Sequence, residues 1–144
     1  MRTDKKYFSN NHNYHLANFL GAIKTAQQKK KPICTYWPCS KFLVSVAGLL
    51  RDEGFIAGFN LKPERNSYLI EVNLKYYVST LNPLISYLTL YATPSRHYNI
   101  TYRDLVSRTR GKTHLYFLST PFGVKTSEYC LSNAIGGNLL FKIR

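Results

Sequence analysis

The spacing of the hydrophobic residues changes along this chain, and that change restricts the fold more than any other feature. Leu16, Phe19, Leu20 and Ile23 follow one another at intervals that place them on one face of a helix. Residues 68–74 instead alternate apolar and polar side chains, as a strand with one solvated face requires. A chain of 144 residues that contains both periods, and is long enough to bury a core, predicts an α+β fold.

The first half of the chain predicts helices and strands in the order α-β-α-β-β. A run of lysines ends the first helix, and residues 33–37 predict a short strand. Ser40 is the expected N-cap of a second helix, which ends at Gly54. The apolar stripe expected on this helix consists of Phe42, Val46, Leu49 and Leu50. Residues 55–61 and 68–74 predict the two following strands, joined by a polar turn.

The second half of the chain predicts a mostly β lobe with a short helix. Apolar runs at 84–92 and 115–118 indicate strands, and residues 99–102 are expected to pair back on the first of them. Residues 104–110 predict a short basic helix, whereas residues 119–123 predict a loop directly after a buried strand. The remaining predicted elements are a helical segment at 127–134 and a final strand at 139–143.

The chain is expected to divide into two small lobes. Residues 77–83 show no periodicity and predict a linker between an N-terminal α/β lobe at 15–76 and a C-terminal lobe at 84–144. Residues 1–14 are polar, and we expect them to form an irregular N-terminal extension.

The net charge of the chain indicates a polyanionic partner. Twenty Lys and Arg against seven Asp and Glu give a formal charge of +13, and a protein bound to a polyanion tolerates such self-repulsion most easily. Nucleic acid is the partner that we favour, although membrane surfaces and acidic proteins are polyanions too. A run of 18 apolar residues and the apolar core of a signal peptide are both missing, so we expect no membrane segment.

Residue types that carry catalysis or bind metals are scattered along the sequence. There is no Gly-rich phosphate-binding loop, and Ser119 and Cys130 lack a nearby candidate base. Three Cys is an odd number, and no second close pair completes a zinc site with Cys34 and Cys39. We therefore expect free thiols, no metal, no cofactor, no small-molecule substrate and no enzymatic activity.

Two features of the second half favour nucleic-acid binding. Between residues 96 and 112, cations are interleaved with Tyr98 and Tyr102, and guanidinium groups fit phosphates while aromatic rings stack on bases. These cations are Arg96, Arg103, Arg108, Arg110 and Lys112. In the loop 119–123, small hydroxyl residues suit the wide minor groove of an RNA helix, and Lys125 and Thr126 follow within reach of a phosphate. The open alternatives are a solvated basic face with core tyrosines, and an ordinary turn.

Four segments resemble the bacterial and organellar family of small ribosomal subunit protein eight. LANFLGAIKTA resembles its first helix, PCSKFLVSVAGLLRDEGFI its second helix and the following strand, TPSRHY a turn between C-terminal strands, and STPFGVKTSEYCLSNAIGGNLLFKIR its C-terminal signature. The resemblance covers residues 16–144. It implies two α+β lobes in a structural constituent of the small ribosomal subunit, which supports subunit assembly and translation. It also implies that the C-terminal lobe binds a helix in the central domain of small-subunit ribosomal RNA, beside neighbouring ribosomal proteins.

The resemblance adds RNA contacts in both lobes to the contact expected at Lys125. The implied residues are Lys24, Thr25, Lys41, Arg96, Ser119, Thr120, Gly123, Gly136, Gly137 and Asn138. Some positions depart from the family pattern. Pro121 stands where a third hydroxyl is usual, Phe122 where a basic or small residue is usual, and Asn138 where a Glu is common.

Two other functions and three locations remain open from the sequence. A small nuclease-like enzyme is the main alternative, but metal-assisted cleavage needs clustered carboxylates, and the second half has only Asp104 and Glu128. A basic adaptor for an acidic protein is a third reading. Phe, Tyr, Met, Ile, Asn and Lys make up 52 of the 144 residues, which indicates A/T-rich codons. A mitochondrial ribosome is therefore the preferred setting, with a plastid or the bacterial cytoplasm as alternatives.

Overall fold

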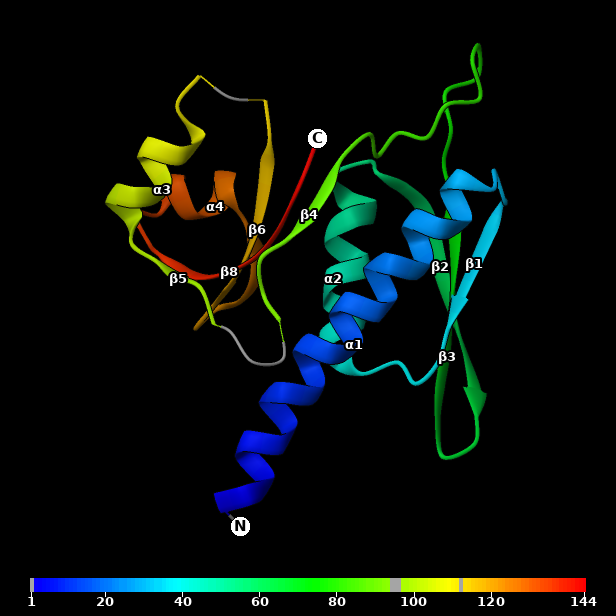
Figure 1. Ribbon diagram of the computed structural model, residues 1–144, viewed down its shortest axis with the longest axis horizontal. Coiled ribbons are helices and arrows are strands. Elements are labelled where there is room, and N and C mark those ends of the chain that lie inside the picture. Colours follow the sequence, from blue (N-terminus) through cyan, green and yellow to red (C-terminus); the bar gives the residue numbers. More distant parts are fainter. Residues whose placement is uncertain (1, 94–96, 112) are drawn as a thin grey trace. The chain divides into compact units, whose positions relative to one another are not determined.

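The computed structural model describes the backbone of residues 2–93, 97–111 and 113–144, and the side chains of these residues from Asn13 onward (Figure 1). The chain separates into two compact units. The N-terminal unit is His15–Ile85, and the C-terminal unit is Ser86–Arg144 together with the first residues of the chain up to Tyr14. Mixed helices and antiparallel sheets confirm the predicted α+β class.

The N-terminal unit contains its elements in the predicted α-β-α-β-β order. They are the part of α1 (Arg2–Gln28) from His15 onward, β1 (Ile33–Tyr36), α2 (Lys41–Asp52), β2 (Ile56–Glu64) and β3 (Ser67–Leu74). The three strands form an antiparallel sheet in the order β1-β3-β2, so the last strand lies in the middle. Ile70, Val72 and Leu74 of β3 are buried, as their alternation predicts.

Helix α1 begins at Arg2, so the prediction of an irregular segment over residues 1–14 is wrong from residue 2 onward. The asparagines of this segment are weak helix formers, but each costs well under about 1 kcal/mol, and neither Gly nor Pro interrupts the helix before Gly21. The predicted stripe of Leu16, Phe19, Leu20 and Ile23 is buried.

Both ends of α2 form as predicted. The Ser40 hydroxyl accepts a hydrogen bond from the Leu43 amide at 3.4 Å. At the other end Gly54, with φ of 82°, donates to the Arg51 carbonyl at 3.0 Å, and the next amide donates to Leu50 at 2.9 Å, which is a Schellman motif. The buried stripe is Leu43, Val46, Ala47 and Leu50. Phe42 and Leu49, predicted in that stripe, are half-buried, because the buried face follows the i, i+3, i+4, i+7 spacing from Leu43 and both residues lie at its margins.

The C-terminal unit is a five-stranded antiparallel sheet with two short helices. Its elements are β4 (Leu88–Leu90), β5 (Asn99–Ile100), α3 (Tyr102–Thr109), β6 (Leu115–Thr120), β7 (Gly123–Thr126), α4 (Ser127–Ser132) and β8 (Gly137–Ile143). The strand order is β4-β8-β6-β7, and β5 also pairs with β8. The strand predicted at 84–92 is shorter than predicted. The predicted pairing of residues 99–102 with it is wrong, because β4 and β5 each pair with β8 and not with each other.

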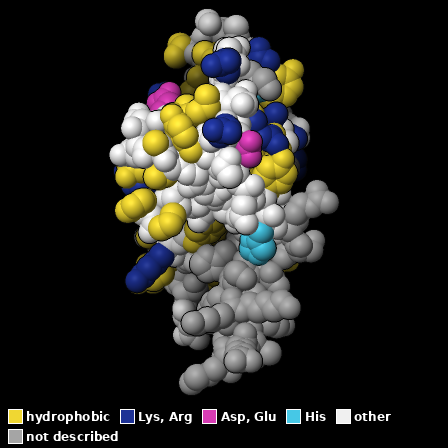
Figure 2. Space-filling model, turned by 90° about the vertical axis from the view of Figure 1, so that its left-hand side faces the viewer, with side chains coloured by type: hydrophobic (Ala, Val, Ile, Leu, Met, Phe, Trp, Pro, Cys, Tyr) yellow, Lys and Arg dark blue, Asp and Glu magenta, His cyan; other side chains and the backbone are white. Residues whose placement is uncertain are grey.

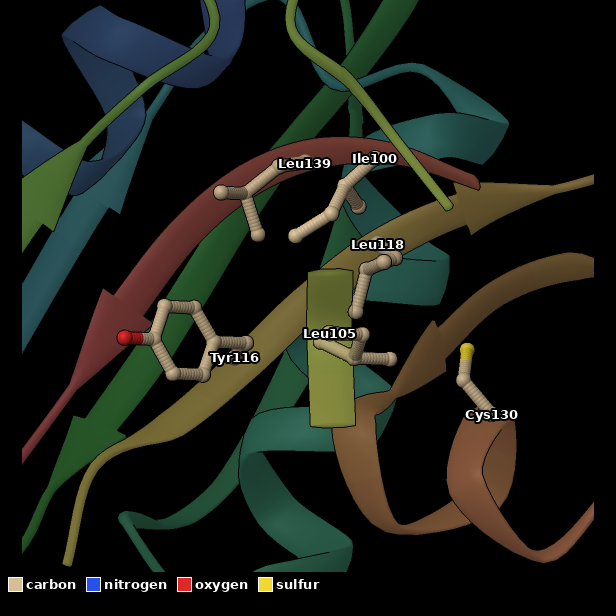
Figure 3. Close-up of a cluster of buried hydrophobic side chains, with 6 residues drawn as sticks. All are labelled: Ile100, Leu105, Tyr116, Leu118, Cys130 and Leu139. Carbon is tan, nitrogen blue, oxygen red and sulfur yellow. The ribbon is translucent and has the colours of Figure 1, made fainter. Parts of the chain in front are cut away.

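One face of this sheet carries the core of the C-terminal unit. Figure 3 shows side chains from β6, β8 and the end of β5 pointing toward one another, together with Leu105 of α3 and Cys130 of α4. The buried set is Ile100, Leu105, Tyr116, Leu118, Cys130 and Leu139. Threonines cap both helices, since Thr101 accepts from the Asp104 amide and Thr126 from the Tyr129 amide. This packing fixes the hairpin and the strand ends on which the candidate residues lie.

Candidate nucleic-acid interface

The predicted hydroxyl loop is a tight β-hairpin turn. Ser119 and Thr120 are the last residues of β6, and Gly123 is the first residue of β7. The Thr120 hydroxyl donates to the Gly123 carbonyl at 2.7 Å and accepts from the Phe122 amide at 3.2 Å. Thr120 is only 9% exposed. Its hydroxyl therefore stabilises the turn from within and is not directed to a ligand.

The tip of this hairpin is the exposed part. Pro121, Phe122 and Gly123 are exposed, and the Phe122 side chain reaches 66%. Gly123 has φ of 108°, a conformation that other residues rarely adopt, so the turn requires a glycine here. Ser119 is half-buried at the base of the turn.

Gly136 and Gly137 let strand β8 approach its neighbours closely. A Cβ on Gly137 would lie 2.6 Å from the Ser119 carbonyl oxygen and 3.1 Å from Cγ2 of Thr120. A Cβ on Gly136 would meet backbone atoms of Ile100, Thr101 and Tyr102. The two glycines therefore position the hairpin and the start of α3 against β8.

Asn138 ties β8 to the segment before β5. Its Oδ1 accepts from the Tyr98 amide at 3.0 Å, and its Nδ2 lies 3.4 Å from Nδ1 of His97. The backbone of Asn138 is in register with Asn99 on one side and Ser119 on the other. Asn138 thus links the base of the hairpin to His97 and Tyr98, which lie in the cation-containing segment between residues 96 and 112.

Arg108 is held among aromatic rings. Its guanidinium carbon lies 5.1 Å from the ring centroid of Tyr98 and 5.9 Å from that of Tyr91, and it donates to the Tyr98 hydroxyl. The Lys142 ammonium lies 5.8 Å from the Tyr91 centroid. We call Tyr91, Tyr98, Arg108 and Lys142 the tyrosine–cation cluster. Such contacts orient the cations while leaving their charge in place.

A shallow hollow of about 440 Å³ lies beside the cluster, lined by residues 97–100, Asp104, Ser107 and Arg108. Seen from the side of α3 and β5, the surface shows Lys and Arg side chains among exposed hydrophobic ones, with few acidic side chains (Figure 2). Sequence reasoning found Arg108 and Tyr98 but missed His97, Asn99 and Lys142. Lys142 lies between the buried Phe141 and Ile143 in β8, and this alternation is the one sequence pattern that could have indicated that its side chain is accessible.

The remaining basic candidates of this unit differ in their surroundings. Lys125 places its ammonium 4.7 Å from the Tyr129 ring centroid. Arg103 and Arg110 are exposed. Thr126, predicted to lie within reach of a phosphate, is buried as the N-cap of α4, and that prediction is wrong. Arg96 and Lys112 lie outside the described residues.

The candidates of the N-terminal unit lie at two separate places. Lys24 and Thr25 are exposed on α1, and Thr25 lines a hollow of about 410 Å³ together with Lys29 and Lys31. Lys41 is exposed at the first position of α2 and lines a different hollow, of about 600 Å³. The structure does not bring these three residues into one site.

The described residues offer little to catalysis. Among them, no group of three His, Cys, Asp or Glu side chains is close enough to hold a metal ion, and no helix is long and apolar enough to cross a membrane. The three cysteines are free and buried. Burial raises the pKa of all three thiols, that of Cys39 to about 11, so few are thiolates at neutral pH.

The chain matches known proteins over most of its length. The family model for ribosomal protein S8 matches residues 15–143. The small ribosomal subunit protein uS8 of Pseudomonas savastanoi pv. phaseolicola is 33% identical over 126 residues, which is 87% of this chain and 92% of the relative. The protein of the same name from Pelagibacter ubique is 30% identical over 128 residues, covering 89% and 95%. These matches confirm the resemblance seen in the sequence, and the chain belongs to the ribosomal protein S8 family.

Proposed function

We propose that this chain is a structural constituent of the small ribosomal subunit that binds ribosomal RNA and neighbouring ribosomal proteins. The observation that carries the proposal is the S8 match, which spans both compact units. The family is structural and non-enzymatic, so the nuclease-like alternative is not retained. At a finer level, the bound RNA is a helix of the central domain with an irregular internal loop, and binding supports subunit assembly.

The mechanism separates phosphate binding from shape recognition. Lys24, Lys41, Arg96 and Lys125 neutralise phosphates, with Thr25 next to Lys24 on α1, and the release of counterions makes the affinity depend on salt. The hairpin of β6 and β7 recognises the shape of the RNA through contacts made by Ser119 and by the exposed tip, which includes Gly123. Thr120, Gly136, Gly137 and Asn138, whose RNA contacts the resemblance implies, also position this surface, because their functional groups or missing side chains are used within the protein.

The proposed location is the mitochondrial small ribosomal subunit, with a plastid or the bacterial cytoplasm as alternatives. The support is the share of residues with A/T-rich codons, whereas the relatives described above are bacterial. Ribosomes purified from organelles and from the rest of the source cells test the proposal. Recovery of the chain only in subunits from outside the organelles would reject it.

The RNA-binding test compares the full chain on a central-domain RNA hairpin and on an unstructured RNA of equal length. We expect tighter binding to the hairpin and a steep fall in affinity with salt. Substituting Lys24, Lys41 or Lys125 by Gln should each lower the slope of log K against log salt by about 1. Lys62→Gln is the matched control, because the Lys62 ammonium is already paired with Glu71 at 2.7 Å. Equal affinity for both RNAs at moderate salt would reject the proposed function.

A further inference from the structure

Phe122 is a large apolar side chain that the fold leaves in solvent. It is 66% exposed at the tip of the β6–β7 hairpin, between Pro121 and Gly123. None of the side chains that form the core cluster of this unit comes from the tip. Exposed aromatic rings on a rigid projection are typical of surfaces that bind another molecule.

The turn that carries Phe122 is held in shape before any partner binds. The backbone amide of Phe122 donates to the Thr120 hydroxyl, which in turn donates to the Gly123 carbonyl. The ring of Pro121 fixes the φ angle of Pro121 itself, directly before Phe122. Gly123 provides the positive φ that closes the turn. Because the backbone is already ordered, little conformational entropy is lost when the ring is buried by a partner.

The chemistry around the hairpin favours a nucleic acid as that partner. Lys125 lies in β7, in register with Leu118 of β6, and is the cation of the hairpin itself, whereas Lys142 and Arg144 lie toward the other end of β8. The one acid between Leu115 and Arg144 is Glu128. Tyr129 is also exposed on α4, and the Lys125 ammonium lies 4.7 Å from the centroid of its ring. Aromatic rings beside cations are the combination that binds unstacked bases and the phosphates on either side of them.

We propose that Phe122 stacks on an unpaired base of the bound RNA and thereby acts as a wedge in an irregular internal loop. This inference rests on the proposed function, and it names the contact made by the tip of the hairpin. A two-residue turn is the narrowest connection between two strands, so the ring can enter a loop that a broader surface cannot. The Phe122 side chain cannot form a hydrogen bond, so it selects an accessible base face and not a base sequence.

The test uses RNA hairpins in which one unpaired adenine at a time is replaced by the fluorescent base 2-aminopurine. Binding of the unmodified chain should change the fluorescence at one unpaired position. Phe122→Ala should abolish that change and weaken binding about 5- to 150-fold. Phe122→Tyr should restore both, because a flat ring returns. Phe122→Leu keeps an apolar side chain of similar size and should remain weak.

Tyr87→Ala provides the matched control. Tyr87 is also 66% exposed, and it lies directly before β4, at the opposite edge of the sheet from β7. This variant should leave the fluorescence change intact. Circular dichroism and thermal unfolding check that all variants are folded, and the Leu and Tyr variants distinguish ring stacking from a general loss of apolar surface.

The outcomes separate the two proposals. If the unmodified chain binds the hairpin but Phe122→Ala binds equally well with the same fluorescence change, the stacking proposal is wrong while RNA binding stands. Phe122→Leu binding as tightly as Phe122→Tyr would also overturn stacking. If the unmodified chain shows no preference for the hairpin over unstructured RNA, the proposed function and the stacking proposal both fail.

Discussion

In the N-terminal unit, the ends of α2 are fixed by bonds between residues close together in the sequence, whereas in the C-terminal unit the strand ends that carry the candidate residues are fixed by bonds between residues far apart. Ser40 and Gly54 close α2 through bonds to amides and carbonyls within four residues. In the C-terminal unit, Asn138 binds the amide of Tyr98, 40 positions away, and the Ser127 hydroxyl accepts from the Tyr116 amide at 3.3 Å. Polar side chains of the C-terminal unit are therefore used to hold the fold as well as to face solvent.

The two units also differ in charge. Residues 15–85 contain nine Lys and Arg and four acids, whereas residues 86–144 contain eight Lys and Arg and only two acids. A lower share of acids favours the C-terminal unit as the stronger site for a polyanion. In the more basic unit, polar side chains such as those of Thr120 and Asn138 are already bonded within the protein, so a polar residue type alone does not indicate a ligand contact.

The largest expected effect concerns the core of the C-terminal unit. Leu105 is fully buried in α3 among the core cluster. Leu105→Ala should lower the free energy of unfolding by about 3 kcal/mol, because it removes buried methyl groups and leaves a cavity. Urea titration followed by circular dichroism measures this loss. Leu61→Ala is the control, since Leu61 is 42% exposed in β2, and it should cost well below about 1 kcal/mol. Equal losses would show that the two positions do not differ in packing.

The same glycine-to-alanine change should lower the stability of the protein in one unit and raise it in the other. Gly137→Ala should destabilise the chain by about 2 kcal/mol, because the new Cβ would lie 2.6 Å from the Ser119 carbonyl oxygen. Gly48→Ala should instead stabilise it by up to about 1 kcal/mol, because Gly48 is inside α2 and its Cβ would meet nothing within 4 Å. Thermal unfolding of both variants checks the signs. A stable Gly137→Ala protein would contradict the close approach of β8 and β6.

The Thr120 hydroxyl should matter for the turn before it matters for RNA. Thr120→Val removes the acceptor of the Phe122 amide and the donor to the Gly123 carbonyl, and should cost about 1 kcal/mol. Thr120→Ser keeps the hydroxyl and should retain most of the stability. Hydrogen exchange of the Phe122 amide reports the turn directly and should accelerate in the Val variant alone. Unchanged exchange in the Val variant would show that the Thr120 hydroxyl does not hold the turn.

The smallest effect is expected at the N-cap of α2. Ser40→Ala should lower the free energy of unfolding by about 0.5 kcal/mol, at the low end for such caps, because the bond to the Leu43 amide is long at 3.4 Å. Ser40→Gly should cost only a few tenths of a kcal/mol. Chemical denaturation of the paired variants measures the difference. A loss above about 2 kcal/mol would show that Ser40 does more than cap a helix.

The distance in sequence between bonded residues also decides what could be predicted from the sequence. Local signals predicted the stripe of α1, the caps of α2 and the alternation of β3, because each depends on residues a few positions apart. The start of α1 was missed because a polar composition does not by itself stop a helix. The bonds of Thr120 and Asn138, and the close approach at Gly136 and Gly137, depend on which strands become neighbours, and no local pattern contains that information.

The self-contained hairpin turn has a consequence for how such a protein can change. Its shape is stabilised by the side chain of Thr120, the ring of Pro121 and the backbone of Gly123, so the side chain at position 122 is not needed to hold it. Position 122 can then be exchanged for other chemistries at little cost in folding. With Phe122 in contact with RNA as proposed, a variant library at this one position should alter which RNA is preferred while the scaffold stays the same.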